Sequence, residues 1–122
     1  MEKLYHEALL DLYRHPLNKT RLDNFNAMQT EHNPLCGETV EIFIQSSPGG
    51  QVADIGWQGD GCALSQAGAS VATEQCKQKS AGEIKNLSTD TILNLLGLAN
   101  LNPSRQRCVG LALAAIKNAL AT

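Results

Sequence analysis

The hydrophobic pattern changes its period in the middle of the chain, and this change restricts the possible folds more than any other feature. From Glu38 onward, β-branched residues recur at every second position, which is the period of a strand (Val40, Ile42 and Ile44). The turn-forming residues 46–50 then reverse the chain, and a second apolar run follows from Val52 to Trp57. Two such runs joined by a short turn predict an antiparallel hairpin.

Helical patterns flank this hairpin on both sides. An amphipathic stretch over Glu2–Arg14 predicts a first helix, which ends before Pro16 because the residue preceding a proline avoids helical geometry. Small residues over 63–77 favour a helix after the hairpin, and Asn102 or Ser104 is a candidate N-cap for the last one. Residues 20–33 are polar without a clear period, so we expect a long loop there. This order predicts an α+β fold in which helices pack on one face of a small antiparallel sheet.

The composition predicts a single folded domain over residues 1–122. Of these residues 43% are hydrophobic and only 18% are charged, which is typical of a globular protein. The net charge of −2 supplies no excess of cations for a phosphate backbone, so nucleic acid is not an expected partner. The longest strongly apolar stretch covers only 108–116, whereas a membrane span needs about 20 residues. With no signal peptide visible at the N-terminus, we expect a cytoplasmic protein that binds no membrane.

Three of the four cysteines lie at the ends of predicted elements. Cys36 precedes the first strand of the hairpin, Cys62 separates the hairpin from the next helix, and Cys108 lies in the first turn or so of the last helix. Side chains at such positions can point out of the core towards a common point. The helix start, together with Arg105 and Arg107, would lower the pKa of the Cys108 thiol. Thiolates are soft ligands that suit zinc or iron–sulfur chemistry.

A carboxylate would complete a four-ligand site with these three thiolates. Glu38, two residues after Cys36, is the nearest candidate, and Asp60, two residues before Cys62, is a rival. The cysteine separations match no compact metal-binding motif, so spacing alone leaves open that these cysteines are buried as small hydrophobic residues. Cys76, inside a predicted helix, is expected to be a surface or packing residue.

Each of the three cysteines is enclosed by a longer motif, at Asn33–Glu38, Gly59–Ser70 and Arg105–Leu113. Their sequences are NPLCGE, GDGCALSQAGAS and RQRCVGLAL. They resemble the motifs NPxCGD, GxGCxxSxAS and RxxC of the U-type iron–sulfur cluster assembly scaffolds, the group that contains IscU, the NifU N-terminal domain and SufU. The motifs stand in the family's order, and the resemblance extends over nearly the whole chain from Tyr5 on.

The resemblance implies both a fold and a function. The fold would be SufE/NifU-like, with about three antiparallel strands and helices on one side. The protein would be a scaffold or carrier rather than an enzyme: it would accept sulfur from a cysteine desulfurase as a persulfide, with Cys36 and Cys108 as candidate acceptors. It would assemble a [2Fe–2S] cluster for apo iron–sulfur proteins or carriers. The ligands of the cluster, of iron, or of zinc as the alternative occupant would be Cys36, Glu38, Cys62 and Cys108.

Two alternatives remain beside the scaffold. One is a zinc-dependent sulfurtransferase partner of the desulfurase, similar to SufU. The other is a purely structural zinc module, which would unfold when the metal is chelated.

Some positions depart from the family pattern. Glu38 stands where the family usually has Asp, which moves the carboxylate by one methylene. Arg107 precedes the last cysteine, where the IscU branch has His and the SufU branch has Lys. The short spacing from Cys62 to Cys108, however, leaves no room for the insertion typical of SufU, so the branch stays open. Residues 98–104 lack the LPPVK segment, so a chaperone that recognises it is not an expected partner.

Overall fold

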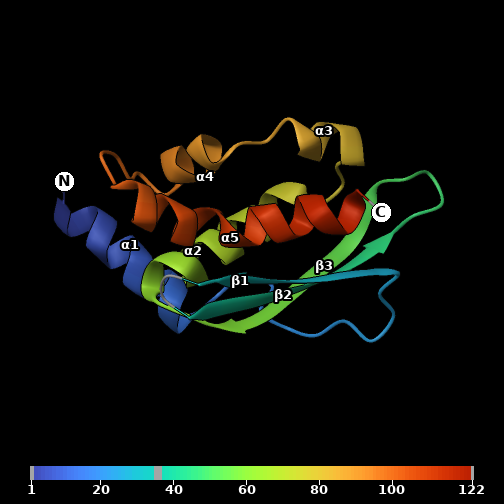
Figure 1. Ribbon diagram of the computed structural model, residues 1–122, viewed down its shortest axis with the longest axis horizontal. Coiled ribbons are helices and arrows are strands. Elements are labelled where there is room, and N and C mark those ends of the chain that lie inside the picture. The colour runs from blue at the N-terminus through green and yellow to red at the C-terminus, as the bar shows by residue number, and fades with distance from the viewer. Residues whose placement is uncertain (1, 35–36, 122) are drawn as a thin grey trace.

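The computed structural model describes residues 2–34 and 37–121, with the side chains of the first helix described from Glu7 on. In these residues a three-stranded antiparallel sheet with the order β1–β2–β3 is covered by helices on one face (Figure 1). The predicted α+β class and the predicted hairpin are therefore confirmed. The elements follow one another as α1 (Glu2–Arg14), β1 (Ala27–Asn33), β2 (Glu38–Ser46), β3 (Val52–Asp60), α2 (Ala63–Cys76), α3 (Ala81–Lys85), α4 (Thr89–Leu95) and α5 (Pro103–Leu120).

The core lies between the inner face of the sheet and the helices α2 and α5. Trp57, which is 2% exposed, joins this core from β3, and its indole Nε1 donates a hydrogen bond to the Leu17 carbonyl oxygen at 2.7 Å. Gly68 of α2 faces Val109 of α5 so closely that a Cβ would collide with the Val109 carbonyl oxygen. Small residues therefore let the two helices approach one another closely. The apolar side chains that fill the space include Val40, Ile42, Ile44, Ile55, Val109, Leu113 and Ile116.

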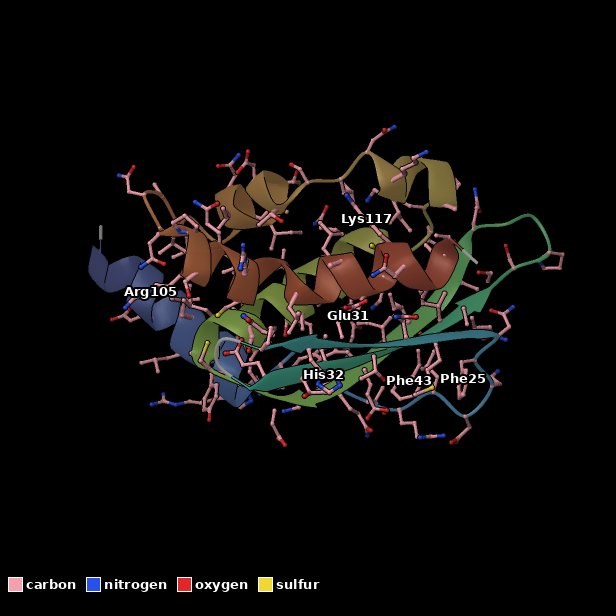
Figure 2. The ribbon with its side chains drawn as sticks, viewed as in Figure 1. Phe25, Glu31, His32, Phe43, Arg105 and Lys117 are labelled. Atoms are coloured by element: carbon pink, nitrogen blue, oxygen red, sulfur yellow. The ribbon has the colours of Figure 1, made fainter. Side chains whose placement is uncertain are left out.

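The strand β1 shows that the prediction of a long loop over residues 20–33 was wrong. β1 pairs with β2 along its whole length. Its burial alternates, but its hydrophobicity does not, because the inward positions hold the polar Gln29 and Glu31. Glu31 accepts a hydrogen bond from Asn118 of α5 at 2.6 Å, and Figure 2 shows it on the side of β1 that faces this helix. Polar side chains on both faces leave no hydrophobic signal for a strand.

The segment between α1 and β1 covers part of the outer face of the sheet. Phe43 points to this face, yet it is 0% exposed. The Phe25 ring lies 5.4 Å from the Phe43 ring, and the Arg21 guanidinium lies 5.2 Å from the Phe43 ring centroid. Figure 2 shows both rings on the side of the sheet away from the helices. A second, smaller apolar contact therefore holds this segment against the sheet.

Two element boundaries have clear local causes. β3 continues through Gly59 to Asp60, and the glycine is needed because a Cβ would collide with the Thr39 carbonyl oxygen. The last helix begins as expected, since the Asn102 side chain accepts a hydrogen bond from the Arg105 N–H and Pro103 occupies the first turn. Among the described helices, none is both long enough and apolar enough to span a bilayer.

Candidate metal centre

One end of the sheet brings remote parts of the chain together. β1 ends at Asn33 and β2 begins at Glu38, and these two residues are opposite one another in the antiparallel register. β3 ends at Asp60, opposite Thr39 of β2, and α2 begins three residues later. Figure 1 shows this end of the sheet beside the start of α2. Strand register, rather than closeness in the sequence, therefore determines which motifs meet here.

Three of the residues singled out from the sequence, Glu38, Cys62 and Cys108, lie together at this end. The two Sγ atoms and a carboxylate oxygen all lie within 4.8 Å of one another. Two sulfur ligands of a tetrahedral zinc ion would be about 3.8 Å apart, so this spacing is close to that of a shared metal site. Asp60, the rival carboxylate, is exposed and does not belong to this group. Cys36 lies outside the described residues.

Glu38 connects β2 to the start of α2. Its side chain is 5% exposed, and its Oε1 accepts a hydrogen bond from the backbone N–H of Cys62 at 3.0 Å. The Cys62 side chain, at the N-cap of α2, makes no capping hydrogen bond, and the Glu38 carboxylate accepts from the N-cap backbone N–H, which has no partner inside the helix. Negative charge is also favourable at this end of a helix. The contact thus fixes Glu38 beside the exposed Cys62 side chain.

Cys108 reaches the same place from α5. It is the sixth residue of this helix and therefore lies in its second turn, beyond the unpaired N–H groups of the first turn that the sequence placed next to it. Its side chain is 8% exposed, and the Asn33 Nδ2 donates a hydrogen bond to its Sγ at 3.7 Å. Asn33 is itself 4% exposed. The sequence motif contained Asn33, but sequence reasoning gave it no role, because no local spacing relates it to Cys108.

Cys76 has the opposite surroundings. It is 0% exposed, and burial raises the pKa of its thiol from 9.0 to about 11, against the opposing influence of Lys79 and Lys117. This thiol therefore stays protonated at neutral pH and packs as an apolar side chain. Of the two roles expected for Cys76, at the surface or in packing, the structure shows packing.

A groove of about 480 Å³ opens between the end of β1 and the helices α4 and α5. Arg107, which precedes Cys108, lines it together with Asn33, whose amide contacts the Cys108 sulfur, and with apolar residues of α5. The groove therefore borders neighbours of the cluster, whereas Glu38, Cys62 and Cys108 are not among its lining residues. Its lining includes Asn33, Pro34, Pro103, Arg107 and Leu111.

Comparison with known sequences identifies the family of the chain. The sequence model of the family described as the NifU-like N terminal domain matches residues 4–122. The chain belongs to this family. Membership confirms the resemblance to the U-type iron–sulfur cluster assembly scaffolds, since relatives of this NifU-like domain carry the IscU and SufU names.

Two relatives and one solved structure show how far the likeness of this NifU-like domain extends. The iron–sulfur cluster assembly enzyme IscU of Drosophila melanogaster is 35% identical over 124 residues, which cover 97% of this chain and 77% of that protein. The zinc-dependent sulfurtransferase SufU of Bacillus subtilis is 33% identical over 79 residues, covering 65% of this chain and 52% of SufU. A NifU-like protein (N-terminal part) from Brucella abortus, 22% identical, has the same fold, with a TM-score of 0.78 and coverage of 96% and 92% of the two chains.

Proposed function

We propose that this protein is a scaffold on which iron–sulfur clusters are assembled and from which they are transferred. The convergence of the Cys62 and Cys108 sulfurs with a Glu38 oxygen at one end of the sheet carries the proposal. Two thiolates favour iron or zinc over the hard cations that prefer oxygen ligands. Relatives of this family named as iron–sulfur cluster assembly scaffolds support the same function.

Cys36 would supply the third sulfur. It is two residues from Glu38 and three from Asn33 in the sequence. This closeness in the sequence supports its inclusion in the same ligand set. Three cysteines and one carboxylate then make up a four-ligand set for a [2Fe–2S] cluster as cargo.

The carboxylate would be the most weakly bound ligand of this set. A carboxylate oxygen is a harder ligand than a thiolate and binds soft metal centres less strongly. The hydrogen bond from the Cys62 N–H orients Glu38 in the way that neighbouring groups orient ligands in metal sites. The exposed Cys62 lies beside it, so the cargo would leave from the solvent side. We therefore propose that Glu38 is the ligand that exchanges first when the cluster is transferred.

A cysteine desulfurase would supply the sulfur. The thiolate of Cys36 or Cys108 attacks the terminal sulfur of the persulfide on the desulfurase. A new S–S bond forms on the scaffold, the S–S bond of the donor breaks, and the donor cysteine leaves as a thiolate. We assign the approach of the donor to the groove lined by Asn33 and Arg107, because the Arg107 cation favours an anionic persulfide.

The second candidate function is that of a zinc-dependent sulfurtransferase partner of the desulfurase. The likeness to SufU favours it, and the sulfur and carboxylate donors that fit iron also fit zinc. Glu38, Cys62 and Cys108, with Cys36, would hold the ion, and bound zinc would keep the thiols deprotonated. The protein's own role would then be to accept one sulfur atom and present it to a later acceptor.

Anaerobic reconstitution with ferrous iron, cysteine, a cysteine desulfurase and a dithiol, which reduces the persulfide sulfur to sulfide, tests the scaffold proposal. We expect visible charge-transfer absorption in the wild-type protein. Glu38→Gln keeps an oxygen acceptor for the Cys62 N–H but removes the charged ligand, so we expect the cluster to be lost at least about tenfold faster. Glu31→Gln is the matched control, because Glu31 also faces inward but hydrogen-bonds Asn118 instead.

Two outcomes decide between the candidates. A folded wild-type protein that takes up no iron under these conditions contradicts the scaffold proposal. If the zinc-loaded protein then still accelerates the desulfurase and acquires one sulfur atom, detected by mass spectrometry, the sulfurtransferase is the function.

A further inference from the structure

Asn33 is a polar side chain buried at the edge of the candidate metal centre. It is the last residue of β1 and is 4% exposed, whereas the other inward polar residues of this strand, Gln29 and Glu31, are only half-buried. An amide removed from water this completely is destabilising unless it is hydrogen-bonded. Its partners therefore indicate what it does.

The side chain of Asn33 joins β1 to the metal-binding part of α5. Its Nδ2 donates a hydrogen bond to the Cys108 Sγ at 3.7 Å, between residues 75 positions apart in the sequence. Its backbone is held against β2, because it is opposite Glu38 in the strand register and its carbonyl oxygen accepts a hydrogen bond from the Gly37 N–H at 2.9 Å. A fixed backbone gives the amide a fixed direction relative to the cluster.

Asn33 and Glu38 each hydrogen-bond a different cysteine of the cluster. They are opposite one another at the inward-facing end of two neighbouring strands, and both are almost fully buried. Glu38 accepts a hydrogen bond from the backbone of Cys62, while Asn33 donates one to the sulfur of Cys108. Each cysteine that the structure describes in this cluster is thus tied to one member of a single cross-strand pair.

We propose that Asn33 is a positioning residue, whose amide holds the Cys108 sulfur in place as a ligand and donates an N–H to that sulfur in the loaded protein. This inference rests on the proposed function, because the hydrogen bond matters to the cargo only if Cys108 is a ligand. Hydrogen bonds to ligand sulfurs raise the reduction potential of iron–sulfur clusters. The partners that orient metal ligands change affinity by about 10- to 100-fold when they are removed.

The chemistry of the amide fits this role better than that of related side chains. An amide donates without carrying charge, so it can be buried beside a sulfur ligand without the desolvation penalty of an ammonium or guanidinium group. An aspartate of the same size offers no N–H when ionised and would repel a thiolate.

Cobalt(II) binding by the whole protein tests the proposal, since thiolate–cobalt charge-transfer absorption reports the sulfur ligands directly. Asn33→Leu keeps similar bulk but has no donor, and we expect the cobalt affinity to fall at least about tenfold, with weaker charge-transfer absorption. Asn118→Leu is the matched control, because it removes the Asn118–Glu31 hydrogen bond between the same two elements without touching a sulfur. We expect it to leave affinity and spectrum unchanged.

The outcomes separate this inference from the proposed function. If the wild-type protein shows no thiolate–cobalt absorption, the proposed function is wrong. If the wild-type protein binds cobalt through thiolate and Asn33→Leu binds it with the same affinity and spectrum, only the role of Asn33 is wrong. Asn33→Ala, with less bulk to accommodate, replaces Asn33→Leu if that variant does not fold, and the same criteria apply. In protein reconstituted with iron and sulfide, either variant should have a lower reduction potential than the wild-type protein.

Discussion

The two ends of α2 give the same kind of side chain opposite surroundings. Cys62, at the N-cap, is exposed and lies beside Glu38 and Cys108. Cys76, the last residue of the helix, is 0% exposed and has a thiol pKa raised by burial to about 11. One thiol is placed to meet a metal, whereas the other remains protonated in the core. The difference in burial between the two cysteines does not come from the helix itself, because they lie at the two ends of the same helix.

The difference lies in what each end of α2 meets. Beyond Cys76 the chain closes over the core: the Val52 N–H donates to the Lys79 carbonyl oxygen, and Gln51 forms a bridge with Ser80. At Cys62 the helix instead meets the ends of strands, where the Glu38 side chain accepts a hydrogen bond from the Cys62 N–H. The register of the sheet therefore places Cys62 beside Glu38 and Cys108, whereas Cys76, fourteen positions later, packs in the core.

The largest difference between the two ends of α2 is expected from serine substitutions of Cys62 and Cys76. Cys62→Ser should abolish cluster loading and leave the melting temperature within about 2 °C, because an exposed site tolerates the change. Cys76→Ser should keep full loading but lower the free energy of unfolding by about 1–3 kcal/mol, since it buries a hydroxyl among apolar side chains. Iron content after anaerobic reconstitution and thermal unfolding measure the two effects. A folded Cys76→Ser protein that fails to load would break the comparison.

A smaller effect concerns alkaline pH. The Cys76 thiol has a pKa of about 11 in the folded protein against an ordinary 9.0, so its contribution to stability is complete below pH 9. As the pH rises from 9 to 11 the unfolded chain releases this proton first, and the free energy of unfolding should fall by about 2–3 kcal/mol. Urea unfolding at pH 8 and pH 11 measures the loss. Cys76→Ala should lack this part of the loss, and parallel pH curves for the two proteins would contradict the prediction.

The smallest effect is expected at Ser65, in the first turn of α2. Its hydroxyl donates to the Cys62 carbonyl oxygen at 3.0 Å but belongs to neither the core nor the ligand cluster. Ser65→Ala should change the free energy of unfolding by no more than about 0.5 kcal/mol. Cluster loading, measured by visible absorption, should stay at the wild-type level. A loss as large as that of Cys62→Ser would mean that the open end of α2 depends on the hydroxyl.

Sequence patterns predicted the parts of the fold that depend on apolar periodicity. The hairpin and α1 appeared in this way, α2 was predicted from its small residues, and the family motifs singled out Cys62, Cys108 and Glu38. β1 did not appear, because Gln29 and Glu31 occupy its inward positions. The contact between Asn33 and Cys108 could not be predicted either, since it depends on how β1 and α5 pack and not on any spacing along the chain.

The polar character of β1 has a consequence for the protein in a crowded solution. In the part of the chain that the structure describes, β1 pairs with β2 on one side only and forms the border of the sheet. A bare strand at such a border offers its backbone amides to any other extended chain and promotes aggregation. Short length and charged or polar side chains discourage this pairing. The residues that concealed β1 in the sequence thus also help to keep neighbouring molecules apart.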